Sequence, residues 1–529
     1  MIHMSEAAAT PASTQARNGA FDLLIVGGGI NGAGIARDAA GRGLNVLLVE
    51  KDDLAAHTSQ WSSKLIHGGL RYLEQYEFRL VAEALAEREV LLRIAPHLIH
   101  PLQFVLPHEP HLRPRWLLRA GLLLYDRLGR LAGQRQTLPK SSAISLCPQA
   151  KEHWGAGLKA HFRYGFVYSD AQVNDARLVV ENVKDAHRRG AVVAVGTTFI
   201  DARRSEGQWA VRLRQRDGVE RTVFARAIVN AAGPWVAEVR NAAATTPARE
   251  SVRHIKGSHI IVSRVHDRRH AYILQNVDGR VVFIIPWCER FSLIGTTDVP
   301  VTEYAAPTIS AQETDYLLAV ANRYLANPLT RADIVSAFAG VRPLYDDGDQ
   351  DPKDVTRDYV LRLETTPEAN RNGPGAPLLN VYGGKITTYR RLAEQALENL
   401  LPHYTHARRS RWTQSPLQTG ASEARLQELR AELVGRGLPA AYALRLMHRY
   451  GMDADALTAG GLPAMGEIFE DLFSEREIDY LRDHEWARDA DAMLARRTKV
   501  GLLATAPALA RIRAAIAAAL ARRAAADLA

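Results

Sequence analysis

The stretch from Asp22 to Glu50 constrains the fold of this chain more than any other part of the sequence. It begins with an apolar run typical of a buried parallel strand and continues with the G-x-G-x-x-G pattern of Gly27, Gly29 and Gly32. A segment of helical character follows, and then a second apolar strand that ends at Glu50. Strand, glycine turn, helix and strand in this order predict a βαβ unit that binds a dinucleotide.

Each glycine of this pattern has its own physical reason. The first permits the tight turn, the second lets the backbone approach a pyrophosphate, and the third lets the helix pack against the strand. The helix N-terminus presents free N–H groups and a partial positive charge to the phosphates. Glu50 lies near the spacing at which an acid binds a ribose hydroxyl.

The composition describes a globular protein of more than one domain. A length of 529 residues predicts two or three domains, and 47% hydrophobic with 24% charged residues excludes a disordered chain. The longest apolar runs are too short to span a membrane. Residues 1–20 lack the apolar core of a signal peptide, so we expect a disordered leader there.

Two cysteines, Cys147 and Cys288, lie far apart in the sequence. They exclude a disulfide scaffold and a four-cysteine iron–sulfur cluster, and they fit a reducing cytosol. No spacing of histidines and cysteines resembles a zinc site, so no metal is expected. The formal charge of +9 suits an anionic substrate, an anionic membrane surface or nucleic acid, although arginines scattered by a GC-rich genome explain it equally well.

The α/β pattern recurs in separated parts of the chain. We expect one Rossmann-like cofactor domain assembled from residues 21–95, 160–250 and 335–395. Alternating apolar and polar residues predict an inserted antiparallel sheet, in a substrate- and membrane-facing domain of residues 96–159 and 251–334. Residues 396–529 have a helical pattern and predict an all-helical C-terminal domain. The predicted fold class is therefore α/β with these two additions.

Cofactor-domain segments that return late in the chain favour FAD, because a nicotinamide dehydrogenase usually keeps its cofactor domain contiguous. Further motifs follow in a fixed order: S-S-K-L-I-H-G-G-L-R-Y-L-E (62–74), I-K-G-S-H-I (255–260), P-W (286–287), I-G-T-T-D-V (294–299), G-V-R-P-L (340–344), T-R-D-Y (356–359), G-G-K-I-T-T-Y-R (383–390) and HEWARDADAMLARRTK (484–499). Together they resemble the aerobic, FAD-dependent glycerol-3-phosphate dehydrogenases, which are similar in fold to the D-amino-acid and glycine oxidase group.

The resemblance implies that the chain oxidises sn-glycerol 3-phosphate to dihydroxyacetone phosphate with FAD and passes the electrons to a membrane quinone. A soluble flavin oxidase of amino or hydroxy acids, which uses oxygen, is the alternative, since a carboxylate also binds arginine. A flavoprotein acting on RNA is suggested only by the net charge and the helical tail. The sequence has no aromatic-and-basic RNA-binding motif, so no nucleic-acid partner is expected.

The substrate is a dianion whose phosphate needs fixed cations. Arg71, Arg342 and Lys385 each lie beside glycines in predicted loops, where side chains can converge on a flavin. Tyr72 and Thr388 could form hydrogen bonds with the substrate oxygens, although local packing or helix capping explains them as well. These five residues are the candidate substrate contacts.

Oxidation of the alcohol removes a hydride from C2 and a proton from its hydroxyl, so it needs a base and a nearby cation. His67 is the first candidate base because an imidazole titrates near neutrality, and His259 is the second. Lys385 could act as a base only if desolvation lowered its pKa, whereas Arg342 is better suited to be an electrostatic clamp.

Cofactor contacts are predicted for the glycine pattern and its terminal acid, for small residues after two later strands, and for a serine pair that resembles the flavin-contacting turn of the family. They are Gly27, Gly29, Asn31, Gly32, Glu50, Ala232, Gly233, Gly383, Gly384, Ser62 and Ser63.

Residues 111–130 predict a basic amphipathic helix, with leucines on one arc and with Arg115, Arg119, Arg130 and Trp116 on the other side. Such a helix can lie in the headgroup layer of an anionic membrane, but its leucines could equally face a protein core. We expect peripheral attachment to the cytoplasmic face of a bacterial inner membrane, through this helix or through the C-terminal arginine-rich one. A homodimer is one possible assembly.

Overall fold

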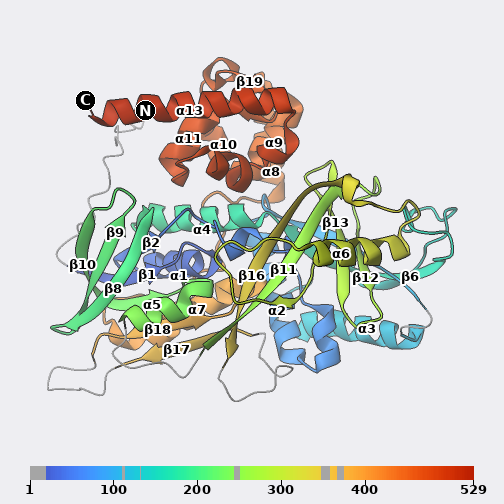
Figure 1. Cartoon of the computed structure of the whole chain (residues 1–529), viewed down its shortest axis with the longest axis horizontal. Coiled ribbons are helices and arrows are strands. Elements are labelled where there is room, and N and C mark those ends of the chain that lie inside the picture. Colours follow the sequence, from blue (N-terminus) through green and yellow to red (C-terminus); the bar gives the residue numbers. More distant parts are fainter. Residues whose placement is uncertain are drawn as a thin grey trace.

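The computed structural model describes residues 20–109, 113–131, 133–243, 251–346, 358–365 and 375–528. Nearly all of the predicted leader, residues 1–19, lies outside this part of the chain. Two β-sheets lie side by side, and a C-terminal group of helices covers one side of both (Figure 1). This arrangement confirms the predicted fold class.

An eight-stranded sheet contains the βαβ unit. Its main path has the order β17 (Val360–Glu364), β18 (Leu378–Tyr382), β10 (Glu220–Asn230), β1 (Phe21–Val26), β2 (Val46–Glu50) and β7 (Val192–Val195). The five consecutive strands β18, β10, β1, β2 and β7 run parallel to one another. Strand β17 pairs antiparallel with β18 at one edge. The remaining strands are β8 (Thr197–Ser205) and β9 (Gln208–Gln215), which extend from β10. All residues of β1 and β2 are buried, as an apolar parallel strand requires.

Three helices cover one face of this sheet: α1 (Ile30–Gly41), α4 (Asp175–Arg188) and α7 (Tyr389–Leu400). Helix α1 packs between the other two, and its apolar residues join those of β1 and β2 in one core. The side chain of Asn174 accepts a hydrogen bond from Arg177 N and so caps the start of α4. Helix α5 (Val236–Ala243) lies beside β8 at the opposite face.

A ten-stranded sheet forms the second half of the molecule. Its main path has the order β15 (Val299–Pro300), β11 (Ser251–Ser263), β14 (Phe291–Gly295), β13 (Val281–Trp287), β12 (Ala271–Gln275), β4 (Ile99–Pro107), β6 (Tyr164–Val173) and β3 (Leu65–Ile66). Strand β16 (Ile334–Asp346) pairs with β11, and β5 (Ser142–Ser145) pairs with β6. The pairs are antiparallel except that of β4 with β12. Helix α6 (Ala311–Tyr324) packs on the sheet through an apolar face.

Sheet membership cuts across the domain boundaries expected from the sequence. Strands β3, β6 and β16 belong to the ten-stranded sheet, although their residues fall in segments expected to form the cofactor domain. Strand β16 pairs with β11 along almost its full length and also contacts β18 of the other sheet. These strands therefore connect the two halves.

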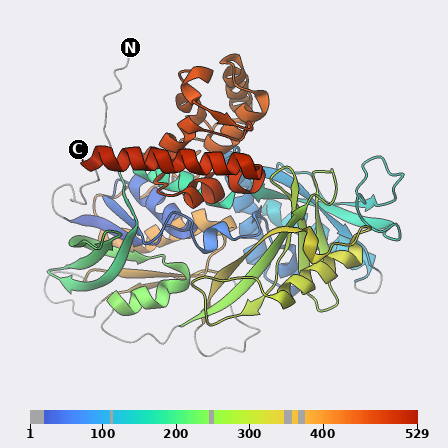
Figure 2. The same ribbon diagram turned by 45° about the horizontal axis from the view of Figure 1, so that its top comes forward.

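The C-terminal part is helical apart from a short hairpin. It comprises α8 (Glu423–Gly435), α9 (Ala440–Tyr450), α10 (Asp453–Leu457), the hairpin strands β19 (Ile468–Phe469) and β20 (Phe473–Ser474), α11 (Glu475–Glu485), α12 (Val500–Leu503) and α13 (Ala506–Leu528). Turning the molecule shows the long helix α13 (red) running in front of the other C-terminal helices (Figure 2). These elements share their own apolar core.

Buried ion pairs join the C-terminal part to the sheets. Arg177 of α4 pairs with Glu485 at the end of α11, and both side chains are fully buried. Arg497 pairs with Asp53, which follows the βαβ unit. Because unpaired buried charges are costly, these contacts fix the C-terminal helices on the sheet and fix the loop after β2.

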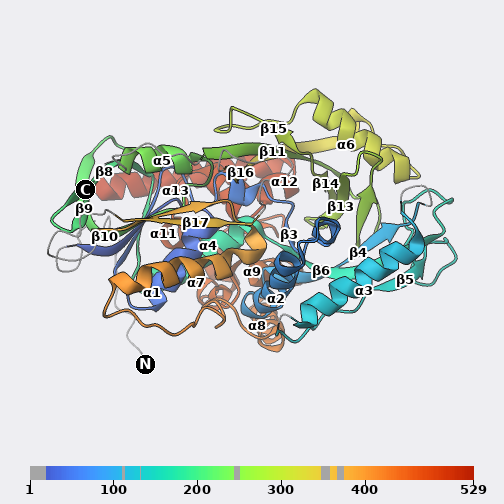
Figure 3. The same ribbon diagram turned by 90° about the horizontal axis from the view of Figure 1, so that it is seen from below.

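Two further helices lie on the side of the molecule away from the C-terminal part (Figures 1 and 3). They are α2 (Phe78–Ile94) and α3 (Arg115–Leu131), and they pack against each other. Residues 111 and 112 of the predicted amphipathic helix lie outside the described part of the chain. Among the described residues no helix has the length and apolar character needed to cross a bilayer.

Candidate active site

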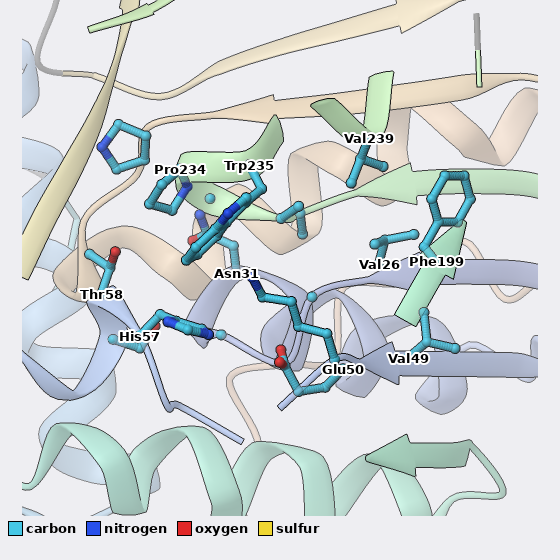
Figure 4. A pocket seen from close by; sticks show the side chains of 18 of the residues that line it. Val26, Asn31, Val49, Glu50, His57, Thr58, Phe199, Pro234, Trp235 and Val239 are labelled. Atoms are coloured by element: carbon cyan, nitrogen blue, oxygen red, sulfur yellow. The ribbon is translucent and has the colours of Figure 1, made fainter. Parts of the chain in front are cut away.

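A cavity of about 450 Å³ opens where strands β1, β2 and β10 end (Figure 4). The glycine turn and the start of α1 form one wall, and the loop after β2 forms another. Strand β8, the turn after β10 and the loop after β18 complete it. This is the carboxyl edge of the parallel strands, where open α/β sheets bind nucleotides.

Two glycines of the G-x-G-x-x-G pattern are required by close backbone packing. Gly27 has a φ of +112°, and a Cβ there would lie 2.5 Å from the carbonyl oxygen of Ala231. A Cβ on Gly32 would lie 1.9 Å from the carbonyl oxygen of Gly27. Side chains at either position would therefore push α1 or β10 away from the turn.

Glu50 lies at the end of β2 and its side chain points into the cavity (Figure 4). One carboxylate oxygen accepts a hydrogen bond from Gly28 N at 2.7 Å, and the other accepts one from Asp52 N at 2.8 Å. Burial raises the pKa of Glu50, while these two N–H donors act in the opposite direction. Each oxygen keeps a lone pair for a further donor, such as a ribose hydroxyl.

The remaining cavity wall fits a dinucleotide. The N-cap of α1, Gly29, has no side chain, and Ser59 Oγ accepts a hydrogen bond from Ile30 N at 3.0 Å. This N-terminus of α1 forms part of the cavity wall. Asn31 donates to the carbonyl oxygen of Gly383 at 3.0 Å, and its own amide oxygen is buried without a partner in the described chain. Backbone N–H groups, an open acceptor and a buried acid are the groups that FAD needs.

The structure brings most of the predicted cofactor residues to this cavity. Its lining includes Gly27, Gly29, Asn31, Glu50, Ala232, Gly233, Gly383 and Gly384. The exceptions are Gly32, which packs beneath the turn, and the serine pair. Ser62 donates to Asp175 at 2.7 Å, and the Ser63 hydroxyl bonds to His259 Nε2 at 3.0 Å. The flavin contact expected of Ser62 and Ser63 stays a prediction.

Sequence reasoning missed an aromatic and cationic part of the lining. The Lys51 ammonium lies 3.5 Å from the centre of the Trp235 ring, and the His57 ring packs edge-on against the same indole at 4.6 Å. His57 also bonds to Asp52 at 2.7 Å. Two sequence features could have indicated these cavity-lining residues. Trp235 comes directly after the small-residue turn, and Lys51 comes directly after Glu50.

The substrate candidates fall into two groups. In the first, His67 N donates to Thr387 Oγ1 at 3.3 Å, and the Lys385 ammonium lies 3.8 Å from the centre of the Tyr72 ring. Arg71 lies beside Tyr72 in the 3-10 helix η2 (Leu70–Gln75). The Arg71 guanidinium has no hydrogen-bond or ion-pair partner among the described residues, which leaves it available to an anion.

In the second group, Arg342 on β16 pairs with Asp298 and reaches Thr296 Oγ1 at 3.3 Å. The neighbouring His259 ring stacks on Phe338 at 4.9 Å. A Cβ on Gly295 would lie 2.1 Å from this ring, so a glycine is needed there. The expected clamp Arg342 is thus already partly neutralised by an acid of the I-G-T-T-D-V motif.

Both candidate bases are neutral imidazoles at pH 7. Burial lowers the pKa of His67, with Lys385 acting in the same direction and Asp170 against it. Burial also lowers the pKa of His259 well below its ordinary value, helped by Lys64 and Arg342. The two differ in position: His67 shares a group with Arg71 and Lys385, whereas His259 is bonded to Ser63.

Thr388 is buried at the start of α7, and among the described residues its hydroxyl forms no hydrogen bond with His67, Arg71 or Lys385. The hydroxyl next to His67 belongs to Thr387. The predicted role of Thr388 stays untested, and Thr387 is the better placed of the two threonines.

Comparison with known proteins agrees with this geometry. The family model described as "FAD dependent oxidoreductase" matches residues 22–361. The chain is 49% identical over 490 residues to a glycerol-3-phosphate dehydrogenase of Pseudomonas aeruginosa, covering 91% of this chain and 92% of that protein. It is 48% identical over 489 residues to a D-erythritol 1-phosphate dehydrogenase of Brucella abortus, covering 90% and 94%.

A solved structure gives the same relationship. The glycerol-3-phosphate dehydrogenase of Bacillus halodurans, determined in complex with FAD, superposes with a TM-score of 0.73. Its sequence is 25% identical, and the match covers 95% of this chain and 90% of that one.

Proposed function

Because the chain belongs to the FAD-dependent oxidoreductases, and within them to the glycerol-3-phosphate dehydrogenase family, we propose that it oxidises sn-glycerol 3-phosphate to dihydroxyacetone phosphate. The near-full-length relationship to the Pseudomonas enzyme carries this proposal. FAD is the cofactor, and the cavity at the end of β1 and β2 has the groups to bind it.

Bound FAD supplies the acceptor for the hydride that leaves C2 of the alcohol. The side chains manage the proton and the charge. His67 is neutral and takes the proton of the C2 hydroxyl as the carbonyl forms. The Lys385 ammonium stabilises the negative charge that develops on this oxygen.

Arg71 is the principal phosphate ligand in this proposal. Its guanidinium has no partner among the described residues, and permanent charge with planar donors suits a phosphate. Arg342 acts from the other group, and its ion pair with Asp298 fixes the direction of its side chain. Arg71 lies in the 3-10 helix η2, whereas Arg342 lies on strand β16.

Replacing Arg71 by alanine is expected to lower kcat/KM for glycerol 3-phosphate. The loss of transition-state stabilisation should be about 2 kcal/mol, the value of a lost charge-assisted hydrogen bond. Turnover of glycerol, which has no phosphate, should change little. Arg342→Ala is expected to cost a similar amount. Arg79→Ala serves as the control, because Arg79 is exposed and pairs with Asp358 at the surface. Equal kcat/KM values of Arg71→Ala and Arg79→Ala for glycerol 3-phosphate would show that Arg71 does not bind the substrate.

A longer phosphorylated polyol is the second candidate substrate. The Brucella relative, named a D-erythritol 1-phosphate dehydrogenase, is about as similar to this chain as the Pseudomonas one. Measuring kcat/KM for both phosphates, for glycerol and for glycine with a water-soluble electron acceptor separates the candidates. Preference for glycerol 3-phosphate supports our proposal, preference for the erythritol phosphate supports the second, and preference for glycine contradicts both.

We further propose that the protein binds a membrane surface through α3 and reduces quinone there. Trp116 is 71% exposed and Leu117 46% exposed, while Leu122 of the same helix is buried. Helix α3 therefore has both a core side and an exposed apolar side. The exposed Tyr76 at the end of η2 adds to this surface, since η2 packs against α3. A tryptophan and leucines beside arginines suit the headgroup layer.

Changing Leu117 and Leu124 together to glutamate is expected to release the protein from anionic vesicles. Both side chains are exposed, so flavin content and activity with a water-soluble acceptor should stay unchanged. The matched control is glutamate at Val434 and Leu462, which are similarly exposed in the C-terminal part. Vesicle sedimentation measures the effect. Undiminished sedimentation of the folded α3 variant would exclude α3 as the anchor and favour the C-terminal helix.

A further inference from the structure

A second cavity of about 330 Å³ lies between α2, α3 and the loop that follows α3. It is separate from the FAD cavity and shares none of its lining residues. Arg130, Arg135 and Lys140 border it and are exposed, and the side chain of none of the three has a hydrogen-bond or ion-pair partner within the described chain. Three uncompensated cations around one cavity attract an anion.

Acidic groups do not cancel this charge. The single acid among the described lining residues is Asp126, whose carboxylate accepts hydrogen bonds from the backbone and the hydroxyl of Ser141. The buried Arg88 also lines the cavity, and its terminal nitrogens are bonded to Asp170 and Glu89. Arg88 is neutralised by its own partners, so the three exposed cations determine the charge of the cavity.

Unsatisfied polar atoms lie in the same wall. Ser169 on β6 is 6% exposed, and its hydroxyl has no hydrogen-bond partner in the described part of the protein. The Nε atom of Arg88 is also buried without one. Buried polar atoms are normally hydrogen-bonded, so these two atoms are available to form hydrogen bonds with a ligand in the cavity. A hydroxyl and guanidinium groups together match the oxygens of a phosphate.

We propose that this cavity binds a phosphate-bearing anion, either the headgroup of an anionic phospholipid or a free phosphate ester. The cavity is larger than one buried water requires and has room for a headgroup. It opens beside α3, the helix that we propose to lie on the membrane. The lipid form of the inference therefore rests on the proposed function, but the anion site does not.

Tyr125 connects the cavity to the segment that carries His67. Its side chain lines the cavity, accepts a hydrogen bond from Gly68 N at 2.9 Å and donates to Asp170 at 2.8 Å. Gly68 follows His67, so one tyrosine separates the bound anion from the residue that we propose as the base. A ligand here would contact Tyr125, and Tyr125 in turn bonds to the segment that carries Arg71 and Tyr72.

Equilibrium dialysis of the FAD-loaded protein with labelled inorganic phosphate tests the site. The Arg71→Ala background weakens phosphate binding at the substrate site, and binding at the second cavity should remain. Adding Arg135→Gln and Lys140→Gln is expected to weaken this remaining binding at least about tenfold, because two charge-assisted contacts are lost. Adding Arg476→Gln and Arg488→Gln, which change the charge equally at exposed C-terminal positions, should leave it unchanged.

Ser169→Ala distinguishes a specific anion-binding site from non-specific electrostatic attraction, because it removes the unpartnered hydroxyl without altering any charge. It should weaken the remaining binding as well. Vesicles then distinguish the sources: phosphatidylglycerol, but not phosphatidylcholine, should compete with phosphate if the ligand is a lipid headgroup, and neither should compete if it is a free ester. Equal phosphate binding in the two charge-matched variants, or its absence in the Arg71→Ala background, overturns the proposal. Failure of the proposed function would instead appear as unchanged glycerol 3-phosphate kinetics in Arg71→Ala.

Discussion

Replacement of His67 by glutamine is expected to lower kcat for glycerol 3-phosphate by about a hundredfold to ten-thousandfold, the usual contribution of a general base. Glutamine keeps much of the size and polarity of the imidazole but cannot accept the proton. The bound flavin should remain, because His67 does not line the FAD cavity. Steady-state kinetics with a water-soluble electron acceptor, normalised to flavin content, measure the effect.

The pH dependence gives a second readout of the same substitution. Burial lowers the pKa of His67 below its ordinary value of 6.5. The neutral, base-competent form is therefore complete above that pKa and is lost as the pH falls through it. The wild-type profile of kcat/KM should fall on the acidic side below pH 6.5, and this limb should vanish in His67→Gln.

His259→Gln is the matched control for this experiment. His259 is also neutral, but its Nε2 is engaged by Ser63 and its ring is stacked on Phe338. We expect a smaller loss of kcat and a retained acidic limb. If His259→Gln removes the limb while His67→Gln keeps it, the base is His259 and our assignment is wrong.

Changing Gly32 to alanine is expected to leave the purified protein without flavin. The new Cβ would lie 1.9 Å from the carbonyl oxygen of Gly27, which is backbone and cannot rotate away as a side chain would. Relief of this contact must separate α1 from the turn that faces the pyrophosphate. The ratio of flavin to protein absorbance after gel filtration measures the loss.

Gly435→Ala provides the control for that change. A Cβ at Gly435, the last residue of α8, would meet no atom within 4 Å. This variant should keep its flavin and its activity. A Gly32→Ala protein with full flavin content would show that the turn tolerates a side chain and that the tight βα contact is not what fixes the cofactor.

The part of the site formed by residues close together in the sequence could be predicted, because their contacts depend mainly on local spacing. The glycine turn, α1 and Glu50 are adjacent in sequence, and their spacing alone requires that they meet at one end of the sheet. Gly383 and Gly384 were predicted from their position after an apolar strand, and β18 does bring them to the cavity. The fold class followed from the same alternation of strands and helices.

Contacts between residues that are far apart in the sequence could not be predicted. Nothing near Arg342 in the sequence indicates that Asp298 neutralises it, because that contact depends on how β16 lies beside β11 and the segment after β14. The helical wheel of α3 likewise could not separate the buried Leu122 from the exposed Leu124, since burial depends on the packing of α2 and the sheet. A periodic pattern identifies a face but not what covers it.

Thr388 was predicted from the sequence without its neighbour Thr387, and the predicted role of Thr388 stays untested. The two residues are adjacent at the junction of a 3-10 turn and α7, where a small change in backbone direction exchanges their side chains. The structure directs the Thr387 hydroxyl toward His67 N. The sequence pattern does not distinguish two adjacent threonines, whereas the backbone direction at this junction does.

Anaerobic mixing of the purified yellow protein with sn-glycerol 3-phosphate tests the central claim most directly, because it follows the bound flavin itself without any acceptor. Our account predicts rapid bleaching of the flavin absorbance with formation of dihydroxyacetone phosphate in equal amount, much slower bleaching by glycerol, and none by glycine. Flavin that stays oxidised with glycerol 3-phosphate, but is bleached by an amino acid, would contradict it.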